Sequence, residues 1–266
     1  MFRYLILAPL MLASLLSASG QPAVSAPRFA AMGASGVALR DLSSLLANQA
    51  GLTALKSAAL AVYREDFTSS IARNSCIFAV PSGRSVVGVG IQSYGVEHYS
   101  EQRAAIALAR RFGEMLSISI DFNIHRLSVS AYGNASAWSV ETGFQYKISP
   151  LLTVAAHVSN PSRNTYKATC NAFVASRLEF GAAWQVSDKI LLNAEASKDL
   201  DFGLVGAAGL EYRLCKYLFL RGGLSTEPFC EHFGFGSAAG SFSFDCAVSV
   251  YEQFGYLPKV GLRYDF

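Results

Sequence analysis

The chain has 266 residues with a formal net charge of +3 at pH 7, and 52% of its residues are hydrophobic. So small a positive charge gives no electrostatic basis for binding DNA or RNA, and we predict no nucleic-acid partner. The five cysteines lie far apart without C-x-x-C spacing, which argues against a redox or metal motif and against a disulfide framework.

The N-terminus has the pattern of a secretory signal peptide. Arg3 supplies a basic start, an apolar run extends from Tyr4 to Leu16, and small residues follow it. The run is shorter than the ~20 residues that a membrane-spanning helix needs, so an anchor helix is disfavoured. We therefore predict a signal peptide over residues 1–20, with a mature chain that begins near Gln21.

Residues 21–56 differ from the rest of the chain. Glycines interrupt this segment, and its leucines recur at roughly helical spacing, which predicts a glycine-rich turn followed by one or two short helices. The stretch from Met32 to Gly36 superficially resembles a phosphate-binding loop. No predicted strand precedes it and no Lys-Ser/Thr pair follows it, so a nucleotide site is disfavoured.

From residue 57 onward the hydrophobic period becomes two. Between Leu116 and Ile124, for example, apolar side chains alternate with Ser, Asp and Asn, as they do in a strand with two different faces. The predicted strands span residues 57–65, 71–80, 84–93, 102–112, 116–125, 138–148, 151–159, 177–186, 189–197, 204–214, 216–223, 231–237, 241–250 and 258–266. They number about fourteen, and single-chain outer-membrane barrels have an even number of strands.

Two architectures produce such alternation. In a soluble sandwich the apolar face turns inward, whereas in a membrane barrel it turns toward lipid. Strands of about ten residues, tight turns alternating with longer loops, and aromatic residues near the strand ends favour the barrel. We predict an all-β fold, a transmembrane antiparallel β-barrel of about 14 strands over residues 57–266, with a short N-terminal helical plug at residues 21–56.

The last predicted strand closes this barrel in the bacterial outer membrane. Tyr264 and the terminal Phe266 lie on its apolar face, so we interpret them as the barrel-closing aromatics and as an assembly signal. The expected partners are therefore the barrel assembly machinery and the surrounding outer-membrane lipid and lipopolysaccharide.

The sequence shows no pattern typical of an active site or a metal site. His125 and His157 fall on the predicted lumen face beside polar residues, where a structural role is the simpler interpretation. No set of His, Cys or carboxylate residues has metal-ligand spacing. We predict no catalytic, cofactor-binding or metal site, and hence no enzyme.

The predicted plug resembles a known family. The stretch from Ala30 to Ala38, followed by Asn48 to Leu52, resembles the opening motif of the FadL-like barrels, and most of all that of the PorV/PorQ family of Bacteroidetes outer-membrane proteins. The motif positions are Met32, Gly33, Gly36, Asn48 and Gly51. This sequence departs from the motif at Ala31, Ala34 and Gln49, where Gly, Gly and Pro are usual. Gln49 lacks the fixed turn geometry of proline, so the path of the plug is left open there.

The resemblance implies two different roles. PorV-like and PorQ-like proteins serve type IX protein secretion as accessory or cargo-receiving components, whereas FadL-like proteins pass long-chain fatty acids or other hydrophobic small molecules. A cargo receptor should expose loops such as Asn160–Ala172 and Ser225–Cys230, while a transporter should have an apolar pocket continuous with its lumen. Compact loops favour secretion, with type IX secretion components or cargo signal domains as partners. The FadL-like channel is the alternative, and a purely structural barrel is a third possibility.

Overall fold

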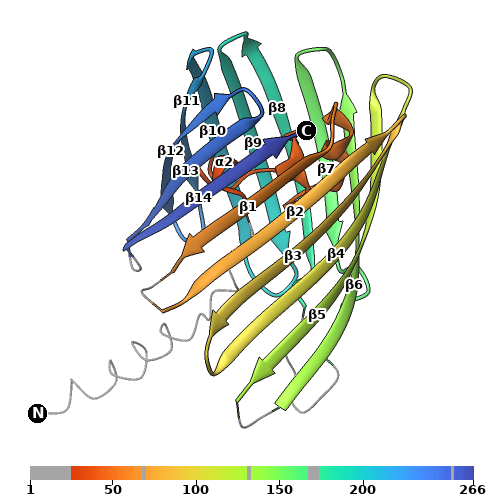
Figure 1. Ribbon diagram of the computed structural model, residues 1–266, viewed down its shortest axis with the longest axis vertical. Coiled ribbons are helices and arrows are strands. Elements are labelled where there is room, and N and C mark those ends of the chain that lie inside the picture. Colours follow the sequence, from red (N-terminus) through yellow and green to blue (C-terminus); the bar gives the residue numbers. More distant parts are fainter. Residues whose placement is uncertain (1–24, 68–69, 131–132, 167–173, 253–254) are drawn as a thin grey trace, which may run out of the picture.

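The wall of the molecule is a closed antiparallel barrel. The computed structural model describes residues 25–67, 70–130, 133–166, 174–252 and 255–266, so the predicted signal peptide over residues 1–20 lies outside the described residues. The strands are β1 (Ala59–Asp66), β2 (Ala72–Ser82), β3 (Ser85–Val96), β4 (Tyr99–Phe112), β5 (Leu116–Val129), β6 (Gly133–Lys147), β7 (Leu152–Ser159), β8 (Arg177–Ser187), β9 (Ile190–Asp199), β10 (Leu204–Cys215), β11 (Leu218–Ser225), β12 (Cys230–Ala239), β13 (Phe242–Tyr251) and β14 (Gly255–Asp265). Each strand pairs with its neighbours in sequence, and β1 pairs with β14 to close the sheet (Figure 1). The predicted antiparallel barrel of about 14 strands is confirmed.

The alternation in the sequence decides which side of the wall faces out. In β5, Ser117, Ser119 and Asp121 are buried inside the barrel, whereas Ile118 and Ile120 between them are exposed on its outer face. A sheet that exposes its apolar side chains outward and keeps polar ones inside is the inverse of a soluble sandwich. The wall therefore suits a hydrocarbon environment.

The two rims of the barrel differ in their connections. Both ends of the barrel chain lie at one rim, since Ala59 pairs with Asp265, and we call this the terminal rim. The connections at the terminal rim are short, as in the turn between Ser187 and Ile190. At the opposite loop rim, the connection from β7 to β8 runs from residue 160 to residue 176. The other connections at the loop rim have two to five residues, against two to four at the terminal rim, so the predicted long loop is the β7–β8 connection.

Strands β4 and β5 extend farther toward the loop rim than their hydrophobic pattern predicts. β4 begins at Tyr99, β5 continues to Val129, and the two pair with each other over these additional residues. The outward side chains there include Ser100 and Arg126, whereas Leu127 of β5 is buried on the inward side, so the alternation is inverted. Backbone hydrogen bonds continue across these strand ends, and a search for outward apolar residues does not find them.

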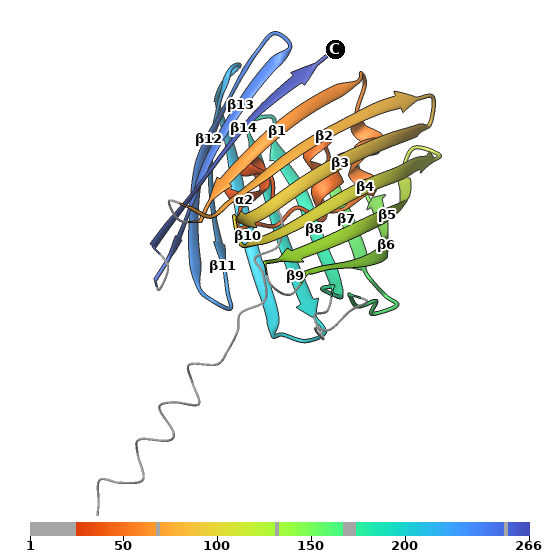
Figure 2. The same cartoon turned by 60° about the horizontal axis from the view of Figure 1, so that its bottom comes forward.

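Residues 25–55 form a plug inside the barrel, which Figures 1 and 2 show enclosed by the strands. It contains α2 (Pro27–Ala30) and the 3-10 helices η2 (Leu42–Leu46) and η3 (Gln49–Ala54). None of the helices in the described part of the chain is long and apolar enough to cross a membrane. The leucines of the plug pack against small wall residues in a buried cluster that includes Leu42, Leu45, Leu52, Ala59, Ala61, Ile77, Ala79, Ala107 and Ala109.

Candidate functional site

The plug comes closest to the wall at Met32 and Gly33. Gly33 has a φ of +80°, and a Cβ atom there would lie 2.6 Å from the carbonyl oxygen of Ala208 in β10. Gly209 and Gly223 of the wall face Met32 and Gly33 and likewise leave no room for a side chain. Positive φ and close backbone approach both require glycine, so this contact depends on glycines from both sides.

The remaining motif residues also lie in the plug. The side-chain amide of Asn48 donates to the carbonyl oxygens of Val37 at 2.9 Å, of Phe144 in β6 at 3.1 Å and of Ala156 in β7 at 3.3 Å. The backbone N–H groups of Gly36 and Val37 donate to one carboxylate oxygen of Glu195, at 2.8 and 3.0 Å. Asn48 and Gly36 thus fasten the plug to neighbouring parts of the wall, at β6 and β7 and at β9.

Gly51 serves the internal packing of the plug. A Cβ atom at this position would lie 2.6 Å from the carbonyl oxygen of Leu39 and would also collide with the side chain of Ser44. The structure therefore places Met32, Gly33, Gly36, Asn48 and Gly51 at tight contacts within the plug or between plug and wall.

Gln49, where the family motif has proline, makes a contact that the sequence did not reveal. It follows the N-cap Asn48 as the first residue of η3, a position that proline also occupies readily. Its amide Nε2 donates to Glu141 at 2.8 Å and contacts Asp121 at 3.4 Å. These partners lie 92 and 72 residues away in the chain, so no local signal could have found them.

Arg28 holds the opposite side of the plug. Its Nε and Nη2 atoms each donate to Glu211 at 2.9 Å, and its Nη1 donates to Asp41 at 2.5 Å. Burial by itself would lower the pKa of Arg28, but Glu211 and Asp41 raise this pKa well above its usual range. Glu211 also accepts from Arg221, which contacts Asp245 in turn. Arg28 therefore stays charged and connects the plug to a wall network of alternating sign.

On the loop-rim side of the plug, the lumen contains a cavity of about 680 Å³. Its lining mixes apolar side chains with charged ones that occur in pairs: Arg103 donates to Glu141 at 2.7 Å, and His157 lies 2.7 Å from Glu179. His125 lies 2.8 Å from the hydroxyl of Ser139. Aromatic side chains complete the lining near the loop rim, among them Tyr94, Tyr99, Tyr166 and Phe202. The lumen thus combines paired charges with aromatic surface.

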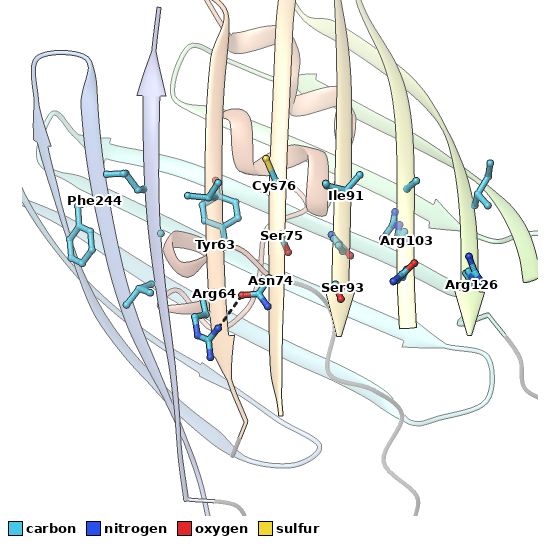
Figure 3. Close-up of a pocket in the computed structure, with 18 residues that line it drawn as sticks. Tyr63, Arg64, Asn74, Ser75, Cys76, Ile91, Ser93, Arg103, Arg126 and Phe244 are labelled. Atoms are coloured by element: carbon cyan, nitrogen blue, oxygen red, sulfur yellow. Dashed lines mark hydrogen bonds between the residues drawn. The ribbon is translucent and has the colours of Figure 1, made fainter. Parts of the chain in front are cut away.

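A second cavity, of about 830 Å³, lies on the outer side of the wall along β13, β14 and β1 to β5 (Figure 3). Its lining is mainly apolar and outward-facing. Gln92, Gln102 and Arg103 of β3 and β4 line both this outer hollow and the lumen cavity. The two cavities therefore meet the same stretch of wall from opposite sides.

The barrel-closing aromatics lie at the seam between β14 and β1. Phe266 is 66% exposed on the outside, and its backbone N–H donates to the carbonyl of Ala58 at 2.9 Å. Its ring packs edge-on against Tyr264, with centroids 4.9 Å apart, and near Phe78 of β2. The side chains around the seam thus form an aromatic cluster facing lipid at the terminal rim.

Within the described residues, no three His, Cys, Asp or Glu side chains gather in a way that could hold a metal ion. No protein-family model matches the sequence, and no curated protein is similar to it in sequence.

Solved structures resemble the fold closely. The toluene transporter TbuX of Ralstonia pickettii has a TM-score of 0.66 at 14% identity, over 91% of this chain and 98% of that one. The toluene transporter TodX of Pseudomonas putida has a TM-score of 0.69 at 12% identity, over 92% and 99%. A FadL homologue from Pseudomonas aeruginosa has a TM-score of 0.68 at 11% identity, over 92% and 99%.

These observations define the class of protein. A closed 14-stranded antiparallel sheet with an apolar exterior and short turns at one rim is a β-barrel of the outer-membrane type. Within that class, the internal plug and the structural matches show that the fold resembles that of FadL-type channels. Nothing in the matches distinguishes the PorV/PorQ family, so membership of that family stays a prediction.

Proposed function

We propose that the protein is a FadL-like outer-membrane channel for small molecules that carry an apolar body and a polar group. One observation supports this most directly: the lumen cavity and the outer hollow share Gln92, Gln102 and Arg103. A molecule that enters at the loop rim would reach the wall of β3 and β4 before it reached the plug.

The plug makes an axial route costly. It is fastened to the wall by the buried leucine cluster, by the amide of Asn48 and by the ion pairs of Arg28. Opening the axis would break these contacts together. The proposed route therefore leaves sideways, through the wall at β3 and β4 into the outer hollow, with the plug in place.

The chemistry of the two cavities supports an amphipathic substrate. The lumen cavity offers charged and hydrogen-bonding groups such as Arg103 and Glu179, whereas the outer hollow offers Val62, Ile91 and Leu262. Together the two cavities match a molecule that has both an apolar body and a polar group. TbuX and TodX are toluene transporters, and this favours a channel over the secretion role that compact loops suggested.

A test needs a barrier that small amphiphiles do not cross unaided, such as the intact outer membrane of a Gram-negative host lacking its own FadL-type channel. Uptake of radiolabelled decanoate is compared for wild type and for Gln92→Trp, which fills the wall between the two cavities. Val89→Trp is the matched control, since Val89 lies on the same strand but faces lipid. We expect wild type and V89W to import decanoate and Q92W to fall to the rate of cells with an empty vector. Equal uptake by Q92W and wild type would exclude the sideways route.

A secretion role is the second candidate, because the loop rim carries exposed aromatic side chains. Phe229, in the connection Ser225–Cys230, is 60% exposed, and Tyr256 at the start of β14 is 74% exposed. Part of the other predicted partner loop, residues 167–172, lies outside the described residues. Deleting the gene in the native organism and measuring release of proteins with type IX signals tests this candidate. Normal release together with lost decanoate uptake would leave only the channel.

A further inference from the structure

A continuous row of polar side chains crosses the outer face of the barrel toward the loop rim. Its members stand directly opposite one another on adjacent strands: Arg64, Asn74, Ser93, Gln102 and Arg126. All of them are exposed on the outer face, and Gln102 also borders the lumen cavity. Figure 3 shows Arg64, Asn74, Ser93 and Arg126 along the ends of β1, β2, β3 and β5. We call these residues the polar row.

The next outward row toward the terminal rim is apolar. It consists of Val62, Cys76, Ile91, Ala104 and Ile124, again at directly opposed positions. The small side chains of Cys76 and Ala104 leave space between the larger ones. Both rows line the outer hollow of about 830 Å³. A ligand that fills this hollow therefore meets polar groups at one edge and hydrocarbon along the other.

The polar row is positively charged at both ends. Arg64 contacts Asp66 at 2.7 Å and the side-chain oxygen of Asn74 at 3.4 Å. Arg126 has neither a hydrogen bond nor an ion pair with any of the described residues, so its guanidinium is open to a ligand. On the other side of the seam the pattern differs, because the positions in register with Arg64 on β14, β13, β12 and β11 are the apolar residues Val260, Cys246, Phe235 and Leu220.

We propose that the outer hollow binds an anionic, phosphate-bearing lipid of the surrounding membrane. The phosphate lies against the polar row at Arg126, because Arg64 stands four strands away and already contacts Asp66, and an acyl chain lies over the apolar row. Guanidinium groups bind phosphate through paired, charge-assisted hydrogen bonds, which favours arginine at such a site. The height of the polar row along the barrel also fits a lipid headgroup, because the outward apolar residues of these strands end at this row. This inference goes beyond the proposed channel and does not depend on transport.

The two tryptophans of the chain make the site measurable. Trp138 of β6 faces outward directly opposite Ile124, at the edge of the outer hollow, whereas Trp184 faces outward on β8. In a Trp184→Phe variant, quenching by dibrominated lipid reports on the hollow. In a Trp138→Phe variant, quenching of the remaining Trp184 reports on a remote part of the wall. Each variant is reconstituted in phosphatidylcholine nanodiscs, and dibrominated phosphatidylglycerol is compared with dibrominated phosphatidylcholine.

Trp138 should be quenched by phosphatidylglycerol with about fivefold preference over phosphatidylcholine, since a basic side chain near an anionic surface contributes about that factor. Trp184 should show a ratio near one. Replacing both arginines, as Arg64→Gln with Arg126→Gln, should bring the Trp138 ratio to about one. Arg110→Gln, an outward arginine at the other end of β4, should leave it unchanged.

Heat-dependent migration on gels confirms that each variant is folded. A Trp138 ratio that survives the double arginine substitution would overturn the proposal, as would an equal preference at Trp184.

Discussion

Replacing Arg28 by methionine should loosen the plug without opening the barrel. The change removes both hydrogen bonds to Glu211 and the contact with Asp41. Breaking a buried ion pair costs about 3–5 kcal/mol. Here the cost is lower, because the Arg28 side chain keeps 21% exposure and Glu211 retains Arg221. We therefore expect the free energy of plug attachment to fall by about 2–3 kcal/mol, which is less than for a fully buried pair.

Hydrogen exchange read by mass spectrometry measures this loss directly. Amides of the plug, including Gly36 and Val37, are protected only while the plug is seated against the wall. A loss of 2–3 kcal/mol raises the opened population by about 30- to 150-fold, and exchange should accelerate by the same factor. Peptides from the strands should exchange as in wild type, since the wall keeps its own ladder of hydrogen bonds.

A matched control separates this effect from a general loss of charge. Arg163→Met breaks an ion pair of similar length with Asp201, but these side chains are 52% and 40% exposed. Exposed pairs contribute at most about 1 kcal/mol, so plug exchange should stay at the wild-type rate. An acceleration below about threefold in Arg28→Met would refute the reasoning. It would mean that the ion pairs of Arg28 contribute less than about 1 kcal/mol to the free energy of plug attachment.

Three further predictions concern the plug and the seam. Gln49→Pro keeps the backbone of η3 but removes the amide donor to Glu141, so plug exchange should rise with a cost of about 1–3 kcal/mol; unchanged exchange would show that water replaces the amide. Gly223→Ala should prevent seating of the plug and raise ion conductance in planar bilayers, whereas Gly206→Ala, with open space around it, should conduct like wild type; equal conductance of the two variants would contradict the close contact. Deleting Phe266 should lower the amount of heat-modifiable barrel in the outer membrane, and normal levels would remove its role in assembly.

The barrel could be read from the sequence because each strand carries its own signal. Alternation within one strand, such as Ile118 and Ile120 against Ser119 and Asp121, already states that one face meets lipid and the other the interior. The prediction failed at the loop ends of β4 and β5, where polar side chains such as Arg126 face outward and Leu127 faces inward. Strand pairing continues there with the alternation inverted.

The plug motif was visible in the sequence, but its contacts were not. The glycine at position 33 indicated an unusual backbone, yet nothing local could show that it lies against Ala208, or that Gln49 reaches Glu141. Such contacts join residues far apart in the chain, and their geometry exists only once the wall has closed around the plug.

The sequence by itself therefore determined the class of fold, the lipid-facing exterior and the presence of a separate N-terminal segment. Local alternation is enough to predict the fold class and the exterior, because each strand that faces lipid carries its own outward apolar residues. Only the tertiary structure decided that Arg64 and Arg126, 62 positions apart, end one polar row, and that two cavities share Gln92 and Arg103. These features depend on register across several strands, and register is fixed by closure of the whole sheet rather than by any one strand.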